Sequence, residues 1–154
     1  MKTKIVSILI MVMALIGCQG KQVIVPAFEI KVDLDERAER ELRTRNETIK
    51  VSLLISGIPR KDSGIRENNK ASGLILGSAE KELVSKGVVR FEGLTIPENL
   101  YQALENKDYG VSVSVRSGWK SSKYNLLNCE PFGNGISELA GKQHIIKCKL
   151  RGSE

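Results

Sequence analysis

Several segments of this chain alternate apolar and polar residues with a period of two, and this pattern constrains the fold more than any other feature. In residues 110–117, Val111, Val113 and Val115 alternate with glycine and serine. Residues 28–35 alternate in the same way. Because successive side chains of a β-strand point to opposite faces of the sheet, each segment predicts a strand with one face in a core and the other in water.

Further strand patterns occupy residues 49–57, 73–83, 88–94 and 143–150. Roughly seven short strands, with turn residues between them and little amphipathic helix, predict an all-β fold: an antiparallel β-sandwich. A transthyretin-like or immunoglobulin-like arrangement fits best, and a small closed barrel remains the alternative because its strands have the same periodicity. Tyr109, directly before the 110–117 strand, resembles the tyrosine corner of immunoglobulin-like sandwiches, in which the hydroxyl bonds to the upstream backbone.

Three connections between these strands have distinct compositions. Residues 35–47 contain good helix formers without a usable apolar stripe, so we expect a charged surface connection in which any helix is short and solvated. Residues 58–72 predict a long polar loop with surplus positive charge, either a plain loop or a contact for an acidic partner or lipid headgroups. Residues 97–104 predict a helical turn that crosses between the sheets.

The N-terminal segment has the layout of a bacterial export signal. Lys2 and Lys4 precede an apolar run that closes with Leu15-Ile16-Gly17-Cys18. The run is too short for a comfortable membrane span of about 20 residues. Its last four residues resemble the lipobox of bacterial lipoproteins, which implies that residues 1–17 are a signal peptide. The alternative is an N-terminal membrane helix with a chance cysteine.

The lipobox resemblance implies that Cys18 carries a covalent lipid, with palmitate among its acyl chains, and that residues 18–25 form a tether to the domain at 26–154. Gln19 stands where an aspartate would signal retention at the inner membrane. By resemblance to this sorting rule, we expect the protein at the outer membrane, on its periplasmic face.

Charge and cysteine content narrow the possible functions. Residues 1–17 hold two lysines and no acids, so removing them from 154 residues with 24 basic and 18 acidic side chains leaves 137 residues with 22 basic and 18 acidic. This mildly basic, well-mixed chain does not predict nucleic-acid binding. Cys129 and Cys148 predict a disulfide that closes roughly twenty residues and contributes about 3 kcal/mol; two independent buried thiols are the alternative. The two cysteines and the single histidine, His144, do not have the spacing of a known zinc-binding motif.

No catalytic motif stands out. His144 lies within a predicted strand, and the chain has no G-x-S-x-G element for a serine nucleophile. The carboxylate pairs Asp33/Asp35 and Glu80/Glu82 have the spacing of one solvated strand face. We therefore expect no enzyme, no cofactor or metal, and no small-molecule substrate.

The loop at residues 117–125 is the best candidate site. Trp119 and Tyr124 offer rigid apolar area, and Lys120 and Lys123 supply positive charge for an acidic partner, a composition typical of protein interfaces. The alternative is that Trp119 folds back to cover the sheet.

Lipobox, size and strand pattern together resemble accessory lipoproteins of secretion machines, including the transthyretin-like lipoprotein of type VI systems and the sandwich pilotins of type III systems. The resemblance implies a non-catalytic lipoprotein that tethers or assembles a protein partner in the cell envelope, and it supplies no binding residue. A protective lipoprotein, acting as an immunity, inhibitor or phage-exclusion factor, is the alternative. A ligand site between the sheets is a third possibility.

Overall fold

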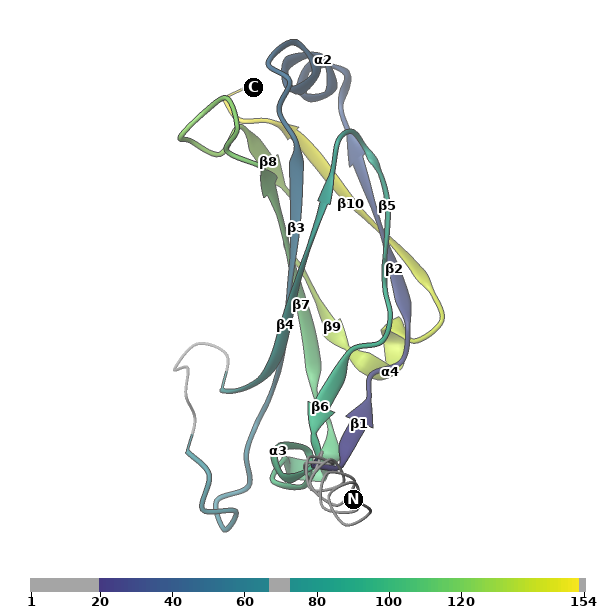
Figure 1. The fold of residues 1–154 in the computed structure, drawn as a ribbon, viewed down its shortest axis with the longest axis vertical. Coiled ribbons are helices and arrows are strands. Elements are labelled where there is room, and N and C mark those ends of the chain that lie inside the picture. Colours follow the sequence, from purple (N-terminus) through teal and green to yellow (C-terminus); the bar gives the residue numbers. More distant parts are fainter. Residues whose placement is uncertain (1–19, 67–72, 153–154) are drawn as a thin grey trace, which may run out of the picture.

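Two four-stranded β-sheets face each other in the computed structural model, which describes residues 20–66 and 73–152 (Figure 1). Within these residues there are ten strands, more than the seven expected. They are β1 (Gln22–Ile24), β2 (Phe28–Leu34), β3 (Ile49–Gly57), β4 (Leu74–Leu83), β5 (Gly87–Phe91), β6 (Thr95–Pro97), β7 (Gly110–Ser117), β8 (Leu127–Cys129), β9 (Phe132–Gly135) and β10 (Gln143–Leu150). The helices are α2 (Glu36–Thr44), α3 (Glu98–Gln102), the 3₁₀ turn η2 (Glu105–Lys107) and α4 (Ile136–Leu139).

The first sheet has the order β4-β3-β7-β9 and is antiparallel throughout. The alternation predicted for β3 and β7 sets its two faces: Ile49 through Ile55 and Val111 through Val115 bury every second side chain. The register between β3 and β4 shifts between Ile55 and Ser56, which marks a β-bulge. The residues between the buried ones, mostly serine and charged, form the outer face.

The second sheet has the order β5-β2-β10-β8, and one of its pairings departs from expectation. β10 runs parallel to β2, with Gln143 opposite Glu29 and Cys148 opposite Leu34, whereas the neighbouring pairs are antiparallel. The β-sandwich architecture is therefore as predicted, but the expectation of a purely antiparallel sandwich is wrong. Period-two alternation fixes which face of a strand is buried and leaves the direction of its neighbour open.

The core lies between the two sheets. Alternate apolar side chains of the inner strands fill it, and Phe28 and Phe91 pack with their ring centroids 5.5 Å apart. The largest fully buried side chains are Phe28, Phe91, Ile30, Ile49, Ile55, Ile96, Leu104, Leu127, Leu139 and Ile146.

A disulfide fixes the edge strand β8 to β10. The sulfur atoms of Cys129 and Cys148 lie at the bonding distance of 2.04 Å, as the sequence predicts, and the two residues stand directly opposite each other in the ladder. The bridge closes 19 residues of chain, and a loop of that size contributes about 3 kcal/mol in the chain-entropy account.

The charged segment after β2 differs from expectation because it forms the regular helix α2. The Asp35 carboxylate accepts a hydrogen bond from the Ala38 amide at 2.6 Å and so caps the helix. Ala38 and Leu42, four residues apart, are both buried against the end of the sandwich. These two apolar positions, about one helical turn apart, form the buried side of α2.

The expected tether is partly ordered. Residues 22–24 form β1, which pairs with β6, and Val25 is buried in the core. Residues 22–25 of the segment expected as a tether are therefore in contact with the rest of the fold. The proposed signal peptide and Cys18 lie outside the described residues.

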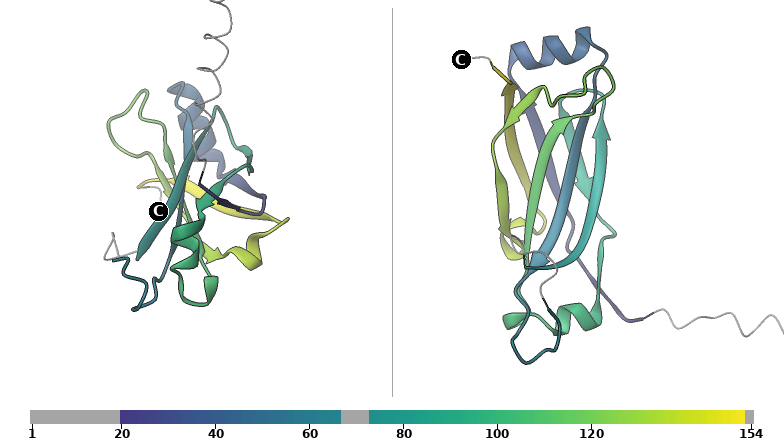
Figure 2. Two further views of the ribbon diagram at one scale, coloured as in Figure 1. Left: turned by 60° about the horizontal axis from the view of Figure 1, so that its bottom comes forward. Right: turned by 90° about the vertical axis from the view of Figure 1, so that its left-hand side faces the viewer.

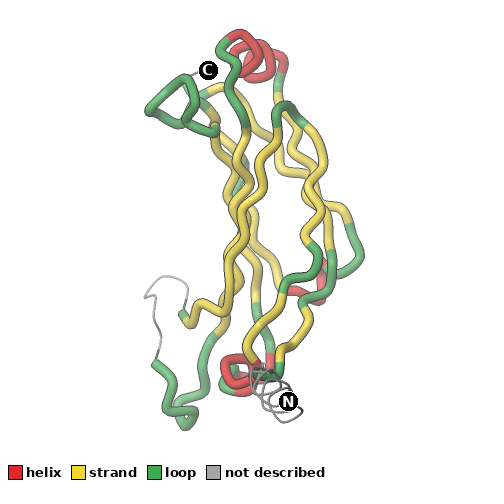
Figure 3. Tube along the Cα trace, viewed as in Figure 1, coloured by secondary structure: helices red, strands yellow, loops and turns green. Residues whose placement is uncertain are grey.

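The sandwich is elongated, and its two ends differ (Figures 1 and 2). One end, here called the β1 end, carries β1, β6, α3 and residues 58–66. The opposite end, here called the α2 end, carries α2, the connection from β7 to β8, and the end of β10 (Figure 3). Ile58, the first residue of the segment 58–66, is 61% exposed.

Tyr109 lies directly before β7, as expected, but it does not form a tyrosine corner. Its ring is buried, edge-on to Tyr101 with centroids 6.2 Å apart. Among the described residues, its hydroxyl makes no hydrogen bond to upstream backbone.

Candidate protein interface

Residues 118–126, here called the 118–126 loop, connect β7 to β8 at the α2 end. Trp119 is 50% exposed and Tyr124 is 69% exposed. The Arg116 guanidinium on the outer face of β7 lies 4.5 Å from the centroid of the Trp119 ring, and Lys123 Nζ lies 5.2 Å from that of Tyr124. Trp119 thus leans on the outer face of the sheet, lies outside the core, and keeps half its surface in solvent.

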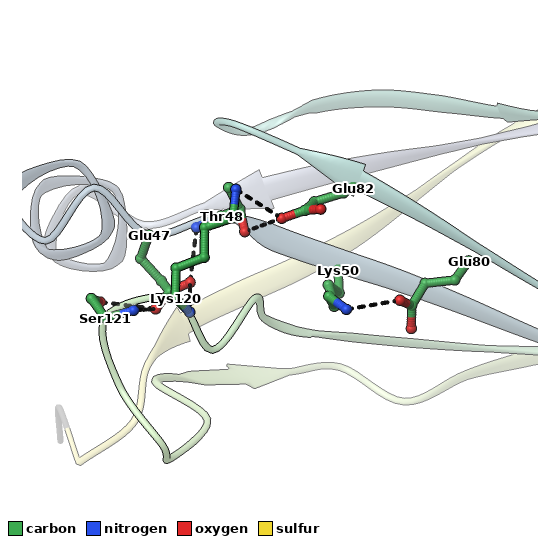
Figure 4. Close-up of polar contacts among 7 residues, drawn as sticks. All are labelled: Glu47, Thr48, Lys50, Glu80, Glu82, Lys120 and Ser121. Carbon is green, nitrogen blue, oxygen red and sulfur yellow. Dashed lines mark hydrogen bonds and ion pairs between the residues drawn. The ribbon is translucent and has the colours of Figure 1, made fainter.

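A buried carboxylate holds the start of this loop (Figure 4). Glu47, between α2 and β3, is only 2% exposed. Its carboxylate accepts hydrogen bonds from the amides of Lys120 at 3.0 Å and Ser121 at 2.8 Å, from the Ser121 hydroxyl at 2.8 Å, and from the Thr48 amide at 3.0 Å. These contacts join segments more than 70 residues apart in sequence and fix the loop backbone.

The electrostatics of Glu47 follow from this geometry. Burial on its own would raise the pKa of the carboxyl, because a charge is costly away from water. The hydrogen bonds from the Lys120 and Ser121 amides, from the Ser121 hydroxyl and from the Thr48 amide outweigh burial and lower the pKa to about 2. Glu47 is therefore ionised at neutral pH and acts as a fixed acceptor that positions the loop.

Close packing and side-chain bonds complete the base of the loop. The Gly118 amide donates to the Thr48 carbonyl at 2.8 Å, and a Cβ at Gly118 would lie 1.9 Å from Thr48 Oγ1. At the other end, the Asn125 side-chain oxygen accepts from the amides of Ser117 and Leu127. The loop is thus tied at both ends, while Trp119 and Tyr124 stay at least half exposed.

The predicted positive charges of the loop have local partners. Lys120 Nζ lies 3.2 Å from Glu82, which also accepts a hydrogen bond from the Thr48 hydroxyl. The hydrogen bond from Thr48, followed by that from Lys120, lowers the pKa of Glu82. Because Lys120 is paired with Glu82, it contributes less free charge to a partner than its position in the sequence suggests. Lys123 remains exposed beside Tyr124.

Neither predicted carboxylate pair has the arrangement of an acid–base site. Glu80 is bound to Lys50, Ser52 and Arg116 on the outer face, and the hydrogen bond from Lys50 is the main cause of its lowered pKa. Asp35 caps α2. Glu80, Glu82 and Asp35 are thus held in structural contacts.

His144 lies within β10, as predicted, with its ring centroid 5.5 Å from that of Phe132. Its Nε2 is buried without a hydrogen-bond partner in the described part of the chain. Beside the disulfide, a hollow of about 670 Å³ is lined by side chains of both signs, among them Asp33, Glu130 and Lys147. Neither feature gathers groups for a recognisable reaction.

Comparisons with known proteins identify no relative: no family model matches the chain, and neither the curated proteins nor the solved structures contain a match. No helix in residues 20–66 and 73–152 is long and apolar enough to cross a bilayer.

The structure brings the four predicted interface residues onto one loop and adds two features that the sequence did not reveal. One is Glu47, which looks like any other acid in a charged run. The other is the set of arginines in α2, which share the α2 end with the loop.

Proposed function

We propose that this protein is a non-catalytic lipoprotein of the outer membrane that binds a protein partner in the cell envelope through the 118–126 loop. The observation that carries the proposal is that Trp119 and Tyr124 are exposed on a loop whose backbone is fixed by the buried Glu47. Rigid, exposed aromatic side chains are typical of the energetic centre of interfaces, because little conformational entropy is lost when they bind.

The position of the loop suits an anchored protein. The lipidated residue in this proposal, Cys18, precedes β1 by only a few residues, so the membrane would lie near the β1 end. The 118–126 loop is at the opposite end of the long axis (Figure 1). An anchor at Cys18 would thus present Trp119 away from the membrane. The more specific role that we propose for the protein is that of an accessory or assembly factor of a secretion system.

The test is crosslinking of the acylated protein in its native envelope, followed by purification and mass spectrometry of the captured proteins. Trp119→Ala is compared with Ile58→Ala, which removes an exposed apolar side chain from the other end. We expect Trp119→Ala to lose the captured partner and Ile58→Ala to retain it, with both variants unfolding at the wild-type temperature. Equal capture by the two variants would refute the proposed interface.

The identity of the captured protein also distinguishes the accessory role from the protective role. Subunits of a secretion machine support the accessory role, whereas a toxin, hydrolase or phage protein would replace it with a protective one. Cys18→Ser tests the anchor: we expect the mature form of this variant in the soluble fraction, and a membrane-bound mature Cys18→Ser protein would refute lipidation.

A further inference from the structure

Three arginines surround one hollow at the α2 end. Arg37 and Arg40 lie three residues apart on α2 and therefore share a face of the helix, and Arg151 follows directly after β10. Together with Glu41, Leu150 and Gly152 they line a hollow of about 290 Å³, here called the arginine hollow.

The guanidinium groups of the arginine hollow have no acidic partner within the described residues. Glu41, which also lines it, pairs with Arg45, and Glu39, on the same helix, pairs with Lys86 at 2.7 Å. No ion pair or side-chain hydrogen bond joins Arg37, Arg40 or Arg151 to any residue of the described ranges. Three like charges around one hollow repel one another, and a bound anion would relieve that repulsion.

The chemistry of arginine defines the ligand group. The guanidinium is planar and permanently charged, and its N–H donors match the two oxygens of a carboxylate or phosphate. We propose that the arginine hollow binds carboxylate groups on an acidic segment of the protein partner. This inference rests on the proposed function and specifies that the partner carries an acidic segment.

The neighbouring loop favours a protein as the source of the carboxylate. The Arg151 amide donates to the Leu126 carbonyl at 2.8 Å, so the hollow adjoins the end of the 118–126 loop. The 118–126 loop, which carries Trp119 and Tyr124, therefore lies at the same end of the molecule as α2 and the end of β10 (Figure 1). Tryptophan, tyrosine and arginine are the residues most enriched at the energetic centres of protein interfaces.

The experiment measures binding of a fluorescently labelled hexaglutamate peptide to the full acylated protein in detergent, by fluorescence anisotropy. We expect each of Arg37→Gln, Arg40→Gln and Arg151→Gln to raise the Kd about three- to tenfold, because a charge-assisted hydrogen bond is lost. Arg43→Gln is the matched control, since Arg43 is exposed on the same helix, lies outside the hollow and carries the same charge. We expect its Kd to stay near that of the wild type.

Two results would overturn the proposal. If Arg43→Gln weakens binding as much as the other variants, the peptide responds to net charge alone. If inorganic phosphate binds and hexaglutamate does not, the hollow serves a phosphate-bearing ligand instead of an acidic protein segment. Crosslinking separates this proposal from the proposed function. If Trp119→Ala loses partner capture while the three arginine variants bind the peptide as the wild type does, the proposal for the arginine hollow is refuted and the proposed interface is retained.

Discussion

Replacing Glu47 by glutamine tests whether one buried carboxylate positions the proposed binding loop. Glutamine has nearly the same shape, but it has no charge, and its amide group turns an N–H₂ toward some of the donors that now face Glu47. Those donors are three backbone amides, of Thr48, Lys120 and Ser121, and one hydroxyl. We expect the variant to fold with a less stable α2 end.

The size of the effect follows from the pKa of Glu47. A fall from the ordinary value of 4.5 to about 2 corresponds to about 3 kcal/mol of unfolding free energy, because a tenfold change in an equilibrium constant is worth about 1.4 kcal/mol. For a domain of this size, such a loss lowers the melting temperature by roughly 10 °C. Amide exchange at Lys120 and Ser121 should accelerate in parallel.

The dependence on pH supplies an independent check. Because folding lowers the pKa of Glu47, the ionised carboxylate contributes its full stabilisation above pH 4.5 and loses it as the pH falls toward 2. Urea unfolding across this range should therefore show the free energies of wild type and Glu47→Gln converging at low pH. Glu80→Gln, a change of an exposed carboxylate, should leave the free energy of unfolding nearly unchanged, because exposed ion pairs contribute little. A Glu47→Gln protein within about 0.5 kcal/mol of wild type at pH 7 would refute the reasoning.

Three further changes probe the packing. Leu42→Ala should cost about 2–4 kcal/mol in urea unfolding, because Leu42 is one of two side chains that bury α2, and a smaller cost would show that α2 is held by other contacts. Gly118→Ala should destabilise by about 1–3 kcal/mol, since its Cβ would overlap the Thr48 hydroxyl; an unchanged melting temperature contradicts this. Replacing both Cys129 and Cys148 with alanine should cost about 3 kcal/mol, with no further loss on adding reductant.

Alternation in the sequence was sufficient to predict the long strands. β2, β3 and β7 bury large apolar side chains at every second position, and the structure places them within about two residues of the predicted segments. The three-residue strands β1, β6 and β8 are too short to show a period. Their pairing depends on partners distant in sequence, which is why fewer strands were expected than the structure contains.

The loop was predicted from its own composition, whereas its support was not. Trp119 and Tyr124 lie among small, polar and charged neighbours, which indicates a loop at the surface. Glu47 lies 73 residues before Lys120, and nothing in its sequence surroundings distinguishes it from the acids of α2. Local sequence describes which residues a loop offers to a partner, but the contacts that hold the loop still come from tertiary structure.

The parallel pairing of β2 with β10 bears on how the chain folds. Glu29 and Gln143 are neighbours across this pair and are joined by a side-chain hydrogen bond, although they are 114 residues apart in sequence. The centre of the second sheet therefore forms only when nearly the whole domain is available, and such long-range closure makes folding slow. Until β10 arrives, β2 has an open edge able to pair with other chains. The last strand in the sequence thus closes the second sheet, and the risk of aggregation during folding falls only once β10 is in place.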